Sequence, residues 1–139
     1  MKFMICGSMH FAKEMQEAQK NLEALGHQAD ISPDTQACIE NPNLNMDLEH
    51  CLASNIDKSC FQLIADSDAI LVLNYSKNGM NGYVGGATLM EIGLARHLDK
   101  KVFILHDLPS EDELRYVLEI KLVRPVILRG DLAKINEHL

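Results

Sequence analysis

The sequence lacks any run of hydrophobic residues long enough to cross a bilayer, and it has no internal repeat or low-complexity segment. The apolar residues that follow Lys2 end at Gly7, too soon for a signal peptide, and are typical of a buried first strand. We therefore expect a cytoplasmic protein with no membrane contact.

The cysteines lack the spacing of a metal site or a redox motif. There are four of them, none in a CxxC pair: Cys6, Cys38, Cys51 and Cys60. In the cytoplasm such residues stay reduced, and a buried free cysteine packs as a small hydrophobic residue. We therefore expect no metal site.

Positive charge is scarce, with 13 basic against 20 acidic residues and a formal net charge of −7. This balance repels a phosphate backbone and argues against a nucleic-acid partner. No arginine precedes Arg96. A phosphate site in the first two thirds of the chain would therefore depend on backbone N–H groups, hydroxyls, and Lys77 or His10.

The apolar residues that are present, within a 47% hydrophobic composition, predict a single domain over residues 1–139. Short apolar runs alternate with helical spacing, which predicts an α/β fold: a doubly wound, five-stranded parallel sheet of the flavodoxin or Rossmann type, in the order 2-1-3-4-5. The expected strands lie near residues 2–7, 27–31, 68–74, 101–105 and 125–128.

The segments between these strands carry further expectations. Helical spacing extends from about residue 11 to residue 25, through residues 48–68, and from Gly86 onward. Ser110 is expected to cap another helix, and a last helix should follow the fifth strand. The polar residues 32–47 include two prolines and predict a long loop, of the kind that often forms a lid.

Ligands of such sheets bind at the carboxyl ends of the strands, where three loops should form one crevice. These loops are "CGSMHF", "NYSKNGMNGYVGGAT" and "HDLPS". The second is rich in glycine, which lets main-chain N–H groups approach a ligand at a helix start. The candidate ligand contacts are Cys6, Gly7, Ser8, His10, Asn74, Gly85, Gly86 and Thr88.

Glu91 is the acid that stands out, because its helical neighbours include the small or apolar residues Thr88, Leu94 and Ala95. It is either a reactive carboxylate or an acid favoured by the helix dipole. Asp68, just before the strand "AILVLN", is either a second reactive acid or a loop carboxylate. Ser8 is either a capping hydroxyl or a ligand contact.

The stretches "CGSM", "SDAILVLN" and "GGATLMEIGLARHLDKKVFIL" together resemble the nucleoside 2-deoxyribosyltransferase family. The likeness covers about the first ten residues and residues 55–105. The family's pattern is of the type G-T-x-x-E-x-G-x-A, followed by a lysine-led strand. Its matching positions here are Thr88, Glu91, Gly93, Ala95 and Lys101.

The resemblance implies that Glu91 attacks the anomeric carbon of a deoxyribose and forms a covalent glycosyl-enzyme, which another base or water then resolves. It also implies that Asp68 protonates the departing base and that Ser8 contacts the sugar or its phosphate. No cofactor is implied. The partner would be a small nucleoside or nucleotide, and the protein would be a homodimer or higher homo-oligomer.

Two positions depart from the family pattern. Gly85 stands where the transferases usually have aspartate and the related deoxynucleoside 5′-monophosphate hydrolases have serine, and Ala87 replaces a glycine. The stretch "VGGATLME" also partly resembles the P-G-G-x-G-T-x-x-E motif of cytokinin-activating phosphoribohydrolases. Three readings therefore stay open: an N-glycosidic transferase or hydrolase, a nucleotide-binding or sensing module without turnover, and a flavodoxin-like or response-regulator-like protein.

Overall fold

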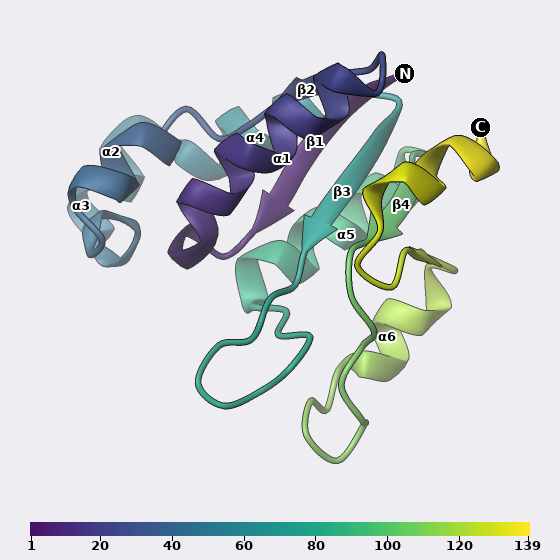
Figure 1. Cartoon of the computed structure of the whole chain (residues 1–139). Coiled ribbons are helices and arrows are strands. Elements are labelled where there is room, and N and C mark those ends of the chain that lie inside the picture. The colour runs from purple at the N-terminus through teal and green to yellow at the C-terminus, as the bar shows by residue number, and fades with distance from the viewer.

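Five parallel strands form one sheet, in the order β2-β1-β3-β4-β5, in the computed structural model of the chain, which describes residues 1–139 (Figure 1). The strands are β1 (Lys2–Gly7), β2 (Gln28–Asp30), β3 (Ala69–Leu73), β4 (Lys101–Ile104) and β5 (Val126–Ile127). Both the predicted fold class and the predicted strand order are confirmed.

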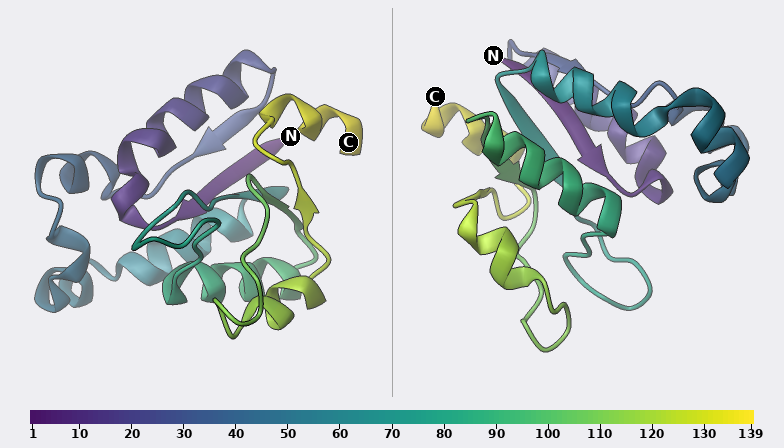
Figure 2. Two further views of the ribbon diagram at one scale, coloured as in Figure 1. Left: turned by 60° about the horizontal axis from the view of Figure 1, so that its bottom comes forward. Right: turned by 180° about the vertical axis from the view of Figure 1, so that it is seen from behind.

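The side chains of the central strands alternate between two apolar layers, as the period of a strand requires. In β1, Phe3 and Ile5 join the layer beneath α1 (Ala12–Ala24) and the C-terminal 3-10 helix (Leu132–His138). Met4 and Cys6 face the opposite layer, which contains α4 (Ile56–Ala65), α5 (Gly86–His97) and α6 (Val117–Leu122). Figure 2 shows these helices on the two faces of the sheet.

The predicted helices α1 and α5 are present, but the helix expected over residues 48–68 is broken in two. It forms α3 (Leu48–Ser54) and α4, which meet at Asn55. Asn55 has a φ of 48° and so adopts the left-handed conformation, which ends α3 and reorients the chain. The break directs α3 away from the sheet while α4 packs against it (Figure 1).

The polar segment over residues 32–47 is not the irregular loop that was expected. It contains α2 (Thr35–Glu40) and a 3-10 helix (Leu44–Met46). Thr35 and Cys38 of α2 are buried, and α2 lies beside α1 (Figure 1). The expectation failed because the buried face of this short helix contains only a hydroxyl and a thiol, which give little apolar periodicity.

The C-terminal third also differs in detail from the sequence prediction. Ser110 bonds with Glu113 in a turn, and α6 begins only at Val117. The last helix has 3-10 geometry over Leu132–His138. None of the helices combines the length and the apolar character needed to span a membrane.

Candidate active site

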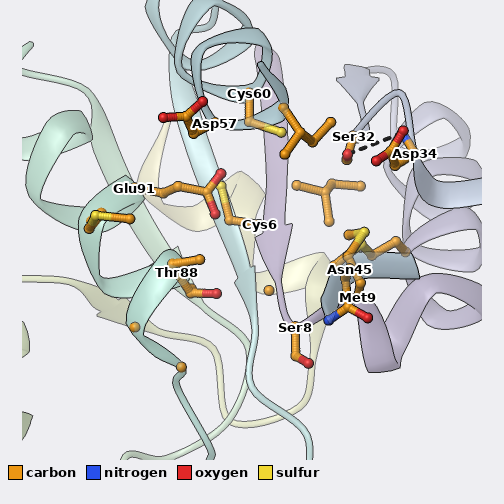
Figure 3. Close-up of a pocket in the computed structure, with 18 of the residues that line it drawn as sticks. Cys6, Ser8, Met9, Ser32, Asp34, Asn45, Asp57, Cys60, Thr88 and Glu91 are labelled. Carbon is orange, nitrogen blue, oxygen red and sulfur yellow. Dashed lines mark hydrogen bonds between the residues drawn. The ribbon is translucent and has the colours of Figure 1, made fainter. Parts of the chain in front are cut away.

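A cavity of about 290 Å³ opens at the carboxyl end of β1, between α4, the start of α5 and the segment that follows β2 (Figure 3). This volume is near the lower end of the range for small-molecule sites. Apolar side chains such as Met9, Ile56 and Phe61 form part of its wall. Polar groups enter from β1, α4 and α5.

Most of the predicted site residues line this one cavity. They are Cys6, Gly7, Ser8, Gly85, Gly86, Thr88 and Glu91. The segments "CGSM" and "NGYVGGAT" therefore lie side by side, as predicted. The roles of these residues in binding or catalysis stay predictions.

Asp68 lies elsewhere, and the expectation that it meets Glu91 in the crevice is wrong. Its Oδ2 atom accepts a hydrogen bond from the backbone N–H of Lys2 at 2.7 Å. Lys2 begins β1 and Asp68 immediately precedes β3. Both residues therefore lie at the amino ends of parallel strands, whereas the cavity lies at the carboxyl ends.

His10 and Asn74 do not line the cavity either. His10 is exposed, and its backbone N–H donates to the Oγ of Ser8 at 3.2 Å. Asn74 is fully buried. Its Nδ2 donates to the carbonyl of His106 at 2.9 Å, and its Oδ1 accepts from the His106 N–H at 2.8 Å. Asn74 thus joins the ends of β3 and β4, which is a structural role.

The loop "HDLPS" does not form the third wall of the cavity. His106 and Asp107 instead line a separate hollow with residues of the loop after β3. Gly82 fixes this arrangement: its φ is 75°, and a Cβ atom there would lie 2.3 Å from the carbonyl oxygen of Asp107. The third wall comes from residues 32–60 instead.

Glu91 extends from α5 into the cavity, where its carboxylate points toward the thiol of Cys6 (Figure 3). Burial raises the pKa of Glu91 from its ordinary 4.5 to about 7, while the hydrogen bond from the Cys6 side chain lowers it. Near neutral pH the carboxylate is therefore divided between its ionised and protonated forms. A pKa this close to neutrality marks a group that can act in catalysis.

The polar groups of the third wall were not predicted from the sequence. They are Ser32 and Asp34 after β2, Asn45 in the 3-10 helix, and Asp57 and Cys60 on α4. Asp57 is exposed in the first turn of α4 and lies at the border of the cavity, on the same side as Glu91 (Figure 3). The helical spacing of Asp57 and Cys60, one turn apart, was the signal that could have placed both on one face.

Asp34 is held in place by a histidine. Its Oδ2 atom lies 2.8 Å from Nε2 of His50 on α3. The N–H of Asp34 also donates to the Ser32 hydroxyl at 3.3 Å. These contacts tie α3 to the segment after β2 and so shape one side of the cavity mouth.

Lys77 supplies a positive charge at the other side of the mouth. Its Nζ donates to the Oγ of Ser8 at 3.1 Å and lies 5.1 Å from the centre of the Tyr83 ring. No carboxylate lies within ion-pair distance of this ammonium group. The nearby start of α5 at Gly86 adds backbone N–H groups and the positive end of a helix dipole.

No group of three or more histidine, cysteine, aspartate or glutamate side chains is arranged to hold a metal ion. The four cysteines are free thiols. Cys6 and Cys38 are buried, whereas Cys51 and Cys60 are partly exposed at the cavity.

The chain shares its fold with a CMP N-glycosidase. The solved structure of BcmB from Clostridium botulinum aligns over 100% of both chains with a TM-score of 0.56, at 17% sequence identity. A 2-deoxyribosyltransferase from Bacillus psychrosaccharolyticus aligns over 75% of this chain and 71% of its own, with a TM-score of 0.49 and 20% identity. No protein-family model and no curated protein sequence matches the chain.

Proposed function

We propose that this protein cleaves the N-glycosidic bond of a nucleoside 5′-monophosphate, with Glu91 as the nucleophile. The observation that carries the proposal is the position of Glu91: a partly buried carboxylate with a pKa near 7, inside a nucleoside-sized cavity at the carboxyl edge of the sheet. The resemblance of its sequence context to the deoxyribosyltransferases and the fold shared with a CMP N-glycosidase support the same chemistry.

In the first step, an ionised Glu91 oxygen bonds to the anomeric carbon of the sugar. The bond from that carbon to the base nitrogen breaks, and its electron pair leaves with the base. A carboxylate suits this step because the transition state carries positive charge on the sugar. The product is a glycosyl ester of Glu91 and a free base.

In the second step, a water oxygen bonds to the anomeric carbon and the ester bond to Glu91 breaks. The proton of the water passes to Asp57, which is ionised once it has donated to the departing base, and the Glu91 carboxylate is restored. When a second base replaces water, the same step is a transfer. Because both steps displace at the same carbon, the configuration of the sugar is retained.

Asp57 takes the role that the sequence analysis gave to Asp68. It borders the same cavity as Glu91 but from the first turn of α4, so a base lying between the two helices would meet it. There it can exchange a proton with the departing base. General acid–base assistance of this kind contributes typically about 10² to 10⁴-fold to a rate.

Lys77, Ser8 and the first turn of α5 favour a substrate with a 5′-phosphate. The ammonium group of Lys77 has no carboxylate partner, and it points at a hydroxyl on the cavity wall. A phosphate between them would gain charge-assisted hydrogen bonds. Lys77 is one of the two cations on which a phosphate site in the first two thirds of the chain was expected to depend.

The test is incubation of the protein with ribo- and deoxynucleosides and their 5′-monophosphates, with and without a second base, followed by chromatography of the free base. We expect base release from at least one monophosphate. Glu91→Gln should lower this release roughly 10³-fold or more, as removal of a nucleophile does. Glu119→Gln, on the exposed face of α6, is the matched control and should retain the parent rate.

A result of tight nucleotide binding with no base release from any substrate would overturn the catalytic proposal. It would instead favour the nucleotide-binding or sensing module that the sequence analysis left open. Retention of the parent rate in Glu91→Gln would reduce Glu91 to an acid that only stabilises the helix start.

A further inference from the structure

The thiol of Cys6 lies at the floor of the cavity, beside the carboxylate of Glu91. Cys6 is only 2% exposed and occupies the penultimate position of β1, where its side chain faces the α4 and α5 layer. Figure 3 shows its sulfur atom next to the Glu91 oxygens. So little exposed surface favours a role through Glu91, and the predicted contact of Cys6 with a ligand stays a prediction.

The Cys6 thiol keeps its proton under the conditions in which Glu91 ionises. Burial, together with the negative charge of Glu91, raises the pKa of Cys6 well above its ordinary value. A protonated thiol has one hydrogen to donate. The thiol lies 3.9 Å from the carbonyl oxygen of Met4, to which it donates, and the Glu91 carboxylate beside it is its second available acceptor (Figure 3). A charged carboxylate is the stronger acceptor, so it accepts the hydrogen bond of the thiol when Glu91 is ionised.

We propose that Cys6 is a positioning residue for the nucleophile: its S–H group holds the ionised Glu91 carboxylate in place on the cavity floor. The catalytic part of this inference rests on the proposed function, whereas the contact between Cys6 and Glu91 does not depend on it. The thiol acts through Glu91 and does not touch the substrate. It favours the ionised form of Glu91, which burial opposes, and it fixes the orientation of the attacking oxygen.

Other ionisable groups share the cavity with Glu91 and must be considered. They are Asp34 after β2, Cys51 on α3, Asp57 and Cys60 on α4, and Lys77 and Tyr83 in the loop before α5. Burial is the main cause of the raised pKa of Glu91, and the Cys6 thiol is the one side chain that lowers it. Cys60 is therefore a matched control: it offers the same thiol in the same cavity without the hydrogen bond to Glu91.

The direct experiment is a carbon-13 NMR titration of the side-chain carboxyl groups in protein labelled at glutamate, between about pH 5 and about pH 9. The Glu91 signal is identified by its loss in Glu91→Gln. Cys6→Ala removes the donor, so the midpoint of Glu91 should rise, and the ionised fraction near pH 6 should fall roughly threefold. Cys6→Ser, which supplies a stronger donor than the thiol, should lower the midpoint below the parent value.

Cys60→Ala should leave the Glu91 midpoint at the parent value. If Cys6→Ala and Cys6→Ser both titrate like the parent, or both shift equally, Cys6 is only a packing residue and the proposal is wrong. Should Cys6→Ala fold poorly, Cys6→Ser alone still decides, because a stronger donor at this site must lower the midpoint.

The rate of base release as a function of pH separates this proposal from the proposed function. The acidic limb of kcat/KM should follow the Glu91 midpoint and move with it in Cys6→Ala. If no substrate releases base, the proposed function fails, but the NMR titration still tests the contact. If the NMR midpoint moves and the acidic limb does not, the contact stands and Glu91 is not the nucleophile.

Discussion

The Nζ atom of Lys77 donates a hydrogen bond to the Oγ of Ser8 at 3.1 Å, although the two residues are 69 positions apart in the sequence. The contact joins the loop after β1 to the loop before α5 and puts an unpaired ammonium group at the cavity mouth. Its charge has no counterpart among the carboxylates nearby. This unpaired charge is the observation on which the proposed 5′-phosphate contact rests.

Lys77→Met should weaken the binding of a 5′-monophosphate while sparing the corresponding nucleoside. We expect KM for the monophosphate to rise about tenfold or more, because one charge-assisted contact accounts for at least ~1.4 kcal/mol. KM for the nucleoside should change less than about twofold. Steady-state kinetics with the matched pair measures both values, and Lys58→Met on the exposed side of α4 is the control. Equal losses for both substrates would contradict a phosphate site at Lys77.

Asp57→Asn and Asp68→Asn make the same chemical change at two places in the fold. Asp57 lies at the cavity, near the carboxyl ends of the strands, and Asp68 lies at their amino ends. Asp57→Asn should lower kcat/KM about 10²-fold for a base that must be protonated as it leaves, and less for an activated base. Asp68→Asn should change it less than about twofold, because Asp68 only accepts a bond from the N–H of Lys2 and an amide oxygen can replace it. The reverse order of effects would restore Asp68 as the acid.

The stability of the protein should depend on the ionisation of Glu91. The pKa of Glu91 is raised from 4.5 to about 7 by burial, so the folded state holds a proton that the unfolded chain has already released in this range. The stability that this proton contributes is fully present below about pH 4.5 and is lost as the pH rises through about 7. The amide side chain of the Glu91→Gln variant cannot ionise, so this variant should not lose that stability as the pH rises.

Urea denaturation checks this expectation. Relative to the parent protein, Glu91→Gln should gain on the order of 2 kcal/mol in free energy of unfolding between about pH 4 and about pH 8. Glu119→Gln should show no such gain, since Glu119 is exposed on α6. A constant difference between Glu91→Gln and the parent across this range would mean that Glu91 is not perturbed by burial.

The sequence predicted the sheet because its central strands are continuous apolar runs. The run that forms β3, Ala69–Leu73, is buried throughout, as a strand covered on both faces must be. The start of α5 was predictable from the glycines before it. The place of Glu91 in the cavity was predictable from its small and apolar helical neighbours. Each of these signals is local, because it lies within its own short stretch of sequence.

The errors concern features that depend on where distant segments meet. Asp68 was placed in the crevice although it lies at the amino end of β3, whereas the cavity opens at the carboxyl ends of the strands. The left-handed conformation of Asn55 separates α3 from α4, and no periodicity in the sequence signals it. Because that break decides which residues of α4 face the cavity, Asp57 escaped notice as well.

Asn74 provides a last test of the fold beneath the site. Its side chain is fully buried and satisfies both backbone groups of His106, with bonds of 2.9 Å and 2.8 Å. Asn74→Ala leaves that N–H and that carbonyl without partners, which should lower the free energy of unfolding by about 2 to 4 kcal/mol. Asn81→Ala, at an exposed position whose amide bonds only to Ser76, should cost less than about 0.5 kcal/mol in the same urea titration. If the two variants lose equal stability, the bonds between Asn74 and His106 do not hold β3 and β4 together at the carboxyl edge of the sheet.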